Sequence, residues 1–338
     1  MKKLISILLV IVMALSVFSL AGCKDKEGGE GEKALTVCVV VSSAFGDKSF
    51  NDSAKEGADK LAKDYGVKVN TIECNEENYK QHMMDAAETS DIVVPVGWQF
   101  YEIAEVAKEY TDTKFIWVDN PVEGIEDLPN VLCILYAQNE GSFIAGYIAA
   151  KMSETGVVGA VGGEDVNTIN DFLTGYEQGA KYANPDIKVV TNYANDYEDP
   201  AKGKECALAL HDQGADVIFQ VAGNTGNGVF AAAKEAGFYA IGVDQDQKIT
   251  ASEYDGQIIC SMKKEVGNSI YDTIKAVVED ESWEGGRIWT ADMSSGYISI
   301  AYGDKDSTQQ VSDELKAEAE DIAAKIVAGE IKVETTRQ

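Results

Sequence analysis

Aromatic, acidic and amide side chains gather in the segments that directly follow predicted strands. In an open parallel sheet, ligands bind outside the carboxyl ends of the strands, so these segments should converge on one site. They contain no nucleophile placed beside a base, and the set suits stacking and hydrogen bonding rather than catalysis. The segments are 42–51, 97–98, 119–120, 162–165, 222–226 and 244–247.

Neither histidine has the sequence context of a metal ligand. His82 and His211 lie in polar helical segments, with no cysteine or histidine at metal-ligand spacing. The glycine-containing segment 223–226 matches neither the dinucleotide-binding nor the phosphate-loop pattern. It predicts a tight turn that lets a ligand approach Gly223 closely. We therefore expect no metal, no cofactor and no enzyme activity.

The five cysteines after position 23 do not suggest a disulfide framework. Cys38, Cys133 and Cys260 lie in or next to Val/Ile runs and are predicted to be buried in strands. The count is odd and no CxxC pair occurs, so we expect free thiols. A disulfide at Cys74 or Cys206 remains open.

The first 23 residues follow the order of a secretory signal. Lys2 and Lys3 precede an apolar run over 4–20, and small residues lead to Cys23. A cysteine at the cleavage point resembles a bacterial lipoprotein signal, which implies that Cys23 becomes the lipid-carrying mature N-terminus. The run is at the short end of the ~17–25 residues that a transmembrane anchor, the alternative, would need. We expect a signal peptide over 1–22 and, because 24–33 is charged and glycine-rich, a flexible linker over 23–33.

The charge balance argues against polyanionic partners. The chain has 57 acidic and 29 basic residues and a formal net charge of −28. Such a chain repels nucleic acid and anionic lipid headgroups, so nucleic-acid binding is excluded and the membrane is reached only through lipid on Cys23. The same charge favours a neutral ligand over a nucleotide.

Short Val/Ile-rich runs alternate with longer amphipathic segments from residue 34 onward. The runs are nearly continuous, which is typical of parallel strands buried on both faces. Strands are predicted at 35–42, 67–73, 91–96, 114–119, 131–135, 156–161, 187–192, 216–221, 239–243, 256–261 and 296–300. Helices are predicted at 50–65, 78–89, 99–110, 139–153, 169–183, 201–212, 225–236, 264–280 and 313–326.

This alternation predicts an α/β fold with two doubly wound parallel-sheet lobes. We expect the N-terminal lobe to comprise 34–136 plus 255–284, and the C-terminal lobe 137–254 plus 285–338. Several chain crossings between the lobes would then form a hinge.

The chain resembles the basic membrane protein family of lipoprotein substrate-binding subunits of ABC importers. The resemblance rests on DKSFN at 47–51, KFIWVD at 114–119, EGSFIAGY at 140–147, GADVIF at 214–219, AGNTGNG at 222–228 and IGVDQDQ at 241–247. It implies a periplasmic-binding-protein type I fold with a purine nucleoside in the cleft between the lobes. It also implies an ABC permease and its ATPase subunits as partners, and a lipid-anchored position on the extracytoplasmic face of the cell membrane.

The resemblance further implies roles for individual side chains. Phe50 would stack on the base, with Asp47 and Asn51 as polar contacts beside it. Asp244 would accept hydrogen bonds from the ribose, and Lys263 would donate one. From the residues alone, other interpretations remain: a helix-capping role for Asp47, a core position for Phe50, turn chemistry for Asp244 and a solvated surface position for Lys263.

Trp98 departs from the family pattern, in which a smaller aromatic residue follows the glycine. The departure leaves pocket size and base preference open. Asp119 follows a strand and is expected to line the same cleft. The second stacking ring is unsettled among Phe172, Tyr197 and Phe219.

Other functions remain compatible with this set of residues. A receptor for riboflavin or a free purine base would use the same aromatic rings, and a sensory binding lipoprotein would have the same architecture. A nucleoside hydrolase is the enzymatic alternative, because carboxylates in a cleft suit glycosidic chemistry. The sequence lacks the metal or general-acid spacing that a hydrolase would need, and binding without catalysis is preferred.

Overall fold

Strand β1 (Thr36–Val41) explains why the central strands of the two sheets are apolar at nearly every position. Val37 and Val39 pack on one face of the first sheet, whereas Cys38 and Val40 pack on the other, and all four side chains are buried. A strand covered on both faces has no solvent side and therefore no alternation. The computed structural model describes residues 34–74 and 78–336, and the predicted signal peptide and linker lie outside them.

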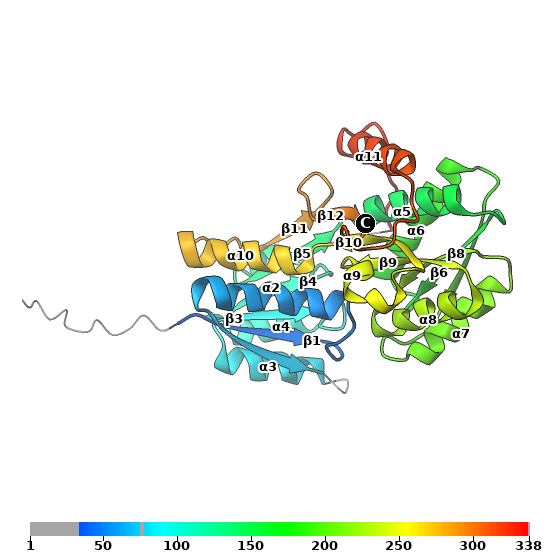
Figure 1. Ribbon diagram of the computed structural model, residues 1–338. Helices are drawn as coiled ribbons and strands as arrows, with labels where there is room; N and C mark the ends of the chain where they lie inside the picture. Colours follow the sequence, from blue (N-terminus) through cyan, green and yellow to red (C-terminus); the bar gives the residue numbers. More distant parts are fainter. Residues whose placement is uncertain (1–33, 75–77, 337–338) are drawn as a thin grey trace, which may run out of the picture. The chain divides into compact units, whose positions relative to one another are not determined.

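The described strands form two six-stranded sheets, seen at the two ends of the folded part in Figure 1. The first sheet is parallel throughout and runs β11 (Arg287–Ala291), β5 (Val131–Tyr136), β4 (Lys114–Val118), β3 (Ile92–Val96), β1 and β2 (Lys68–Glu73). The second runs β12 (Ile298–Ala301), β10 (Ile258–Lys264), β9 (Tyr239–Asp244), β8 (Val217–Val221), β6 (Val157–Gly162) and β7 (Lys188–Tyr193), with only β12 antiparallel. The predicted doubly wound α/β architecture is confirmed.

Helices cover both faces of each sheet. On the first sheet, α2 (Phe50–Tyr65) and α10 (Val266–Asp280) pack on one face, and α3 (Tyr79–Thr89) and α4 (Ile103–Glu109) on the other. On the second, α5 (Gln138–Met152) and α6 (Asn167–Ala183) oppose α7 (Pro200–His211) and α8 (Asn227–Ala236). The short α9 (Gln247–Thr250) follows β9, and α11 (Asp313–Val327) packs against α5.

Two strands belong to a different lobe from the one that the expected lobe boundaries assign to their residues. β10, within the 255–284 segment expected in the N-terminal lobe, pairs with β9 in the second sheet. β11, which was not predicted, pairs with β5 in the first sheet. In the described residues, sheet membership makes the chain pass between the lobes three times: after β5, after β10 and after β11. The chain returns from the second lobe to the first after Lys264, the last residue of β10, and not near residue 255 as expected.

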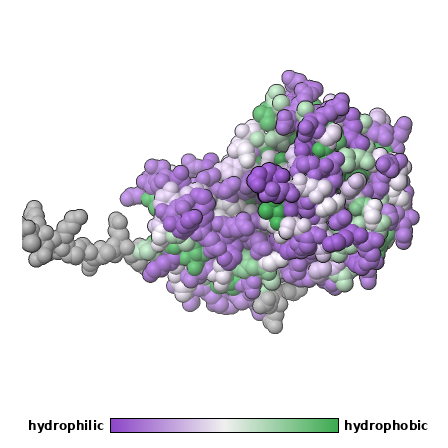
Figure 2. Space-filling model, in the orientation of Figure 1, coloured by the Kyte–Doolittle hydropathy of each residue, from purple (hydrophilic) through white to green (hydrophobic). Residues whose placement is uncertain are grey.

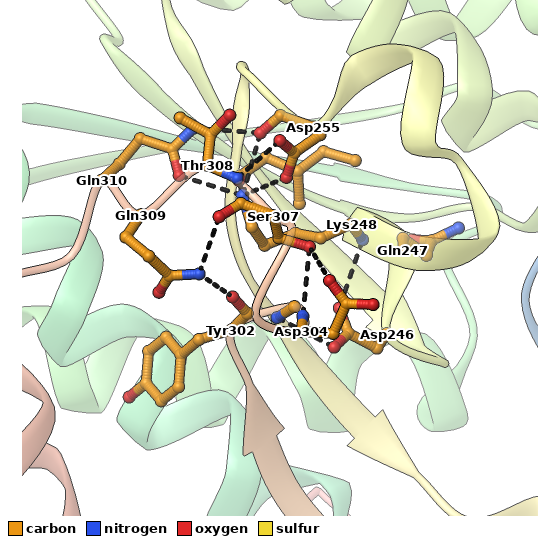
Figure 3. Close-up of polar contacts among 12 residues, drawn as sticks. Asp246, Gln247, Lys248, Asp255, Tyr302, Asp304, Ser307, Thr308, Gln309 and Gln310 are labelled. Atoms are coloured by element: carbon orange, nitrogen blue, oxygen red, sulfur yellow. Dashed lines mark hydrogen bonds and ion pairs between the residues drawn. The ribbon is translucent and has the colours of Figure 1, made fainter.

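A buried lysine fastens α9 to the segment that follows β12 (Figure 3). The ammonium of Lys248 donates to the carbonyl oxygens of Asp255 at 2.9 Å and Ile258 at 2.6 Å, and to Oε1 of Gln310 at 2.9 Å. It also pairs with the Asp255 carboxylate at 2.8 Å. The Asp246 carboxylate caps α9 by accepting from Lys248 N and joins the β12 side by accepting from Gly303 N. These contacts hold α9 in position against the second sheet.

The exposed surface fits the acidic composition. The face in Figure 2 is largely hydrophilic, with scattered apolar patches. The five described cysteines are free thiols, as expected for Cys38, Cys133 and Cys260. The alternative of a disulfide at Cys74 or Cys206, which the sequence left open, is not what the structure has. In residues 34–74 and 78–336, no helix combines the length and apolar character that a membrane crossing requires.

Candidate functional site

A cavity of about 570 Å³ lies at the carboxyl ends of the strands of both sheets. Its walls come from the segments after β1, β3 and β4 in the first lobe, and from those after β6, β7, β8 and β9 in the second. This is where open α/β sheets bind ligands, and the volume is in the range of small-molecule pockets. The described residues include no cluster of three or more His, Cys, Asp or Glu placed to hold a metal ion.

The segment after β1 is shaped by Asp47. Its buried carboxylate accepts hydrogen bonds from the backbone N–H groups of Ser49 at 3.0 Å, Asn51 at 2.9 Å and Asp52 at 3.1 Å. Burial raises the pKa of Asp47 to about 7, against the opposing effect of these three N–H donors. The Asn51 amide in turn donates to Ala44 O at 2.9 Å. Both side chains line the cavity, and both also hold the backbone that presents Phe50.

A buried ammonium ion lies among three aromatic rings at the base of the cavity. Lys264 Nζ pairs with Asp119 Oδ2 at 2.5 Å, and their side chains are 2% and 7% exposed. The same nitrogen lies 4.7 Å from the ring centre of Phe50, 4.9 Å from that of Tyr136 and 5.1 Å from that of Phe172. These distances are within the range of cation–π attraction. Because Phe50 belongs to the first lobe and Phe172 to the second, both lobes contribute a ring to this centre.

Asp244 connects the two lobes at the edge of the cavity. Its Oδ2 accepts from the Ser49 hydroxyl of the first lobe at 2.5 Å, and its backbone adopts a positive φ of 64° at the end of β9. Burial raises the pKa of Asp244 to about 6, while the nearby Lys264 ammonium opposes the rise. A carboxyl in this position can accept hydrogen bonds from ligand hydroxyls when it is ionised.

Further contacts join the lobes beside Asp244. The carbonyl oxygen of Lys48 accepts from Gln247 Nε2 at 3.2 Å and from Thr250 Oγ1 at 3.0 Å. The Lys48 ammonium forms an ion pair with Glu253. Because α9 supplies Gln247 and Thr250, the Lys248 contacts that fix α9 also fix this interlobe seam. The structure therefore has the two lobes in contact beside the cavity.

Trp98 and Tyr197 line another part of the cavity, one from each lobe. Gly97, with φ of 115°, turns the chain after β3 to present Trp98. Tyr197 lies against two glycines: a Cβ on Gly163 would come within 2.1 Å of its ring, and Gly223 adjoins it at a positive φ of 55°. Gly163 thus makes room for an aromatic ring of the wall, whereas Gly223 is favoured by its positive φ.

Eight of the nine predicted ligand-binding residues line the cavity: Asp47, Phe50, Asn51, Trp98, Asp119, Phe172, Gly223 and Asp244. Lys263 does not line it, and its ammonium pairs with Glu265 on the opposite side of β10. Its neighbour Lys264 lines the cavity instead, because successive side chains of a strand point to opposite faces. Of the candidates for a second ring, Phe172 and Tyr197 line the cavity, whereas Phe219 is buried against Phe172 and Tyr176.

Tyr136 and Lys264 are site components that the sequence did not identify. Tyr136 is the last residue of β5 and is fully buried, with its hydroxyl 2.6 Å from Ser269 Oγ. A signal for Lys264 was present: a lysine at the end of an otherwise buried apolar strand needs a buried partner. The sequence offered two adjacent lysines, and it did not indicate which one faced inward.

Comparisons with known proteins agree with this architecture. Residues 34–337 match the family described as "Bmp: ABC transporter substrate-binding protein PnrA-like". Basic membrane protein A of Borreliella burgdorferi is 32% identical, with 98% of this chain and 96% of that protein covered. The ABC transporter nucleoside-binding protein BmpA of Lactococcus lactis subsp. cremoris is 33% identical, with 96% and 99% covered.

Solved structures give the same result. A solute-binding protein of an ABC transporter system from Aeropyrum pernix K1 has a TM-score of 0.80 at 27% identity and covers 90% of this chain and 94% of its own. A periplasmic solute-binding protein from Actinobacillus succinogenes 130z, solved with bound D-allose, shares the fold with a TM-score of 0.62 at 15% identity and 79% and 97% coverage. The chain belongs to the Bmp family of PnrA-like ABC transporter substrate-binding proteins.

Proposed function

We propose that this protein is a lipid-anchored extracytoplasmic receptor that binds a purine nucleoside and delivers it to an ABC permease. The observation that carries the proposal is the composition of one cavity. Aromatic rings from both lobes, Phe50 and Phe172, share it with a buried ion pair and with Asp244. A nucleoside has a flat base and a neutral, hydroxyl-rich sugar, and these are the two chemistries that this lining serves. The name of the Lactococcus relative supports the same ligand class.

In the proposed complex the base stacks on Phe50, and the ribose hydroxyls face Asp244 and the Asp119–Lys264 pair. Stacking of one base on an aromatic side chain contributes ~1–3 kcal/mol in nucleic-acid proteins. Burying hydroxyl-binding groups gives selectivity, because an analogue without the hydroxyl leaves these groups unpaired. Contacts from both lobes favour the closed arrangement, which the permease would then recognise.

Charge explains the preference for a nucleoside over a nucleotide. The cavity is lined by seven carboxylates: Asp47, Glu102, Asp119, Glu164, Asp196, Glu198 and Asp244. Among the described residues that line the cavity, Lys264 is the only lysine or arginine. Its ammonium is already paired with Asp119. A phosphate group would therefore enter a negative site without a free cation to receive it.

Calorimetric titration of ligand-stripped protein tests this proposal. We expect guanosine, inosine or adenosine to bind, whereas ribose, free bases and riboflavin should bind much more weakly. Phe50→Ala should weaken nucleoside binding about 5- to 150-fold. Phe45→Ala is the matched control, because Phe45 lies on the same segment but does not line the cavity. Binding of riboflavin in place of nucleosides, or equal effects of the two substitutions, would contradict the proposal.

A further inference from the structure

The start of α6 forms part of the second-lobe wall of the cavity. The described helix contributes Thr168, Ile169 and Phe172 to the lining, all within its first two turns. Phe172 is also the second-lobe ring beside the Lys264 ammonium. The position of these two turns therefore sets where the ring meets a ligand.

Backbone contact with α5 holds the later turns of α6. A Cβ on Gly175 would come within 2.2 Å of the Asn139 carbonyl oxygen, so the two helices touch there without intervening side chains. A Cβ on Gly179 would come within 1.7 Å of the Phe143 carbonyl oxygen. Both glycines come after Phe172 in the chain. The turns that carry the lining side chains therefore depend on further contacts to fix them.

A segment near the end of the chain supplies such contacts, and we call residues 333–336 the strap. Thr335 Oγ1 and Thr336 N donate to Asp171 Oδ1 at 2.5 Å and 3.0 Å. Thr336 Oγ1 donates to the Asn167 carbonyl oxygen at 3.0 Å. Asp171 is fully buried and directly precedes the cavity ring in the sequence. The strap thus bonds to the same turns of α6 that line the cavity.

The strap is also anchored at its other end, beside α5 and α6 (Figure 1). Glu334 N donates to Gln178 Oε1 at 2.9 Å, and Gln178 Nε2 donates to Glu334 O at 3.1 Å. The Asn139 amide of α5 donates to the carbonyl oxygens of Val333 and Glu334, both at 3.2 Å. Hydrogen bonds to both helices therefore hold a segment that belongs to neither a helix nor a strand.

We infer that the strap is a positioning element of the binding site: it holds the first turns of α6 so that Phe172 meets the ligand, and nucleoside affinity depends on it. The inference rests on the proposed function. None of the four described strap residues lines the cavity, so the strap acts through the helix and not by touching the ligand. A binding side chain delivers its full contribution only when supporting contacts hold it within about 0.5 Å of the productive position. Asp171 transmits this support because it lies in the same helical turn as the ring.

Calorimetric titration of ligand-stripped full-length protein with guanosine, inosine and adenosine tests the inference. Thr335→Val removes the hydroxyl that donates to Asp171 and keeps the side-chain shape, so it should weaken binding about 3- to 10-fold. Thr335→Ser keeps a hydroxyl and should bind within about 2-fold of the unmodified protein. Thr155→Val is the matched control, because Thr155 is likewise exposed in the second lobe and donates to Gly214 O at 2.7 Å, outside the cavity lining. It should leave the affinity unchanged.

A double variant distinguishes positioning of the ring from a general structural role. Phe172→Leu removes the ring, so adding Thr335→Val to it should weaken binding by less than about 2-fold. Should Phe172→Leu bind too weakly to measure, the contrast between Thr335→Val and Thr335→Ser serves as the test. Unchanged affinity in Thr335→Val, an equal loss in Thr335→Ser, or the same loss with and without the ring would overturn the inference and leave the proposed function intact. Absence of binding of every nucleoside to the unmodified protein would instead overturn the proposed function, and the inference with it.

Discussion

Replacing Asp119 with asparagine should destabilise the protein strongly, because it leaves the Lys264 ammonium buried without its carboxylate. The two charged atoms are 2.5 Å apart and nearly inaccessible to solvent. At an effective dielectric constant of about 20, unit charges at this distance attract by about 7 kcal/mol, and desolvation offsets much of that. Removing one partner from a buried pair costs about 3–5 kcal/mol. We expect about 3 kcal/mol, since the Asp244 carboxyl and three rings still face Lys264.

The reverse variant and the double variant distinguish a charge effect from a packing effect. Lys264→Met leaves Asp119 without its cation and should cost a similar amount. Asp119→Asn combined with Lys264→Met removes both charges, so it should be at least about 2 kcal/mol more stable than the sum of the single effects predicts. Asp59→Asn is the control: Asp59 forms an equally short pair with Lys55, but on the exposed surface of α2. That substitution should change stability by less than about 0.5 kcal/mol.

Urea unfolding of the chain from residue 34, followed by tryptophan fluorescence, measures these differences. Nucleoside titration of the same variants shows whether the double variant, although folded, has lost affinity. The reasoning fails if Asp119→Asn unfolds within about 1 kcal/mol of the unmodified protein. It fails equally if the effects of the two single substitutions simply add in the double variant.

Two further expectations follow from the site and the helix packing. Burial raises the pKa of Asp244 to about 6, above the ~3.9 of an unfolded aspartate. Between these values the folded chain keeps a proton that the unfolded chain has released, so this group's contribution to stability is present at low pH and lost as the pH rises through 6. Asp244→Asn should therefore gain about 2–3 kcal/mol relative to the unmodified protein between pH 4 and pH 7 in urea titrations, and a constant difference would refute the assignment. Gly146→Ala should cost about 2 kcal/mol or more, because its Cβ would lie 2.0 Å from the Tyr176 carbonyl oxygen between α5 and α6. Gly256→Ala, with no atom within 4 Å of its Cβ, should be nearly neutral, and equal thermal midpoints for both variants would contradict the packing argument.

The sequence by itself determined the secondary structure and the fold class. Hydrophobic periodicity is a local property, and it located eleven of the twelve described strands and the long helices. It missed β11, whose residues Arg287 and Ile288 are exposed, because a short edge strand lacks a buried pattern. It also placed the second interlobe passage near 255 rather than after Lys264, since local composition does not show which sheet a strand joins.

The sequence also determined which segments form the site, because the carboxyl ends of parallel strands meet at one edge. Only the tertiary structure decided which side chains of those segments face the cavity. The pairing of β10 with β9 and β12 turns Lys264 inward and Lys263 outward, a one-residue difference that reverses the face. Likewise, Phe172 of α6 lines the cavity, whereas Phe219, in the middle of β8, packs against Phe172 and Tyr176 and does not line it. These outcomes depend on contacts between residues far apart in the chain, which local sequence patterns do not encode.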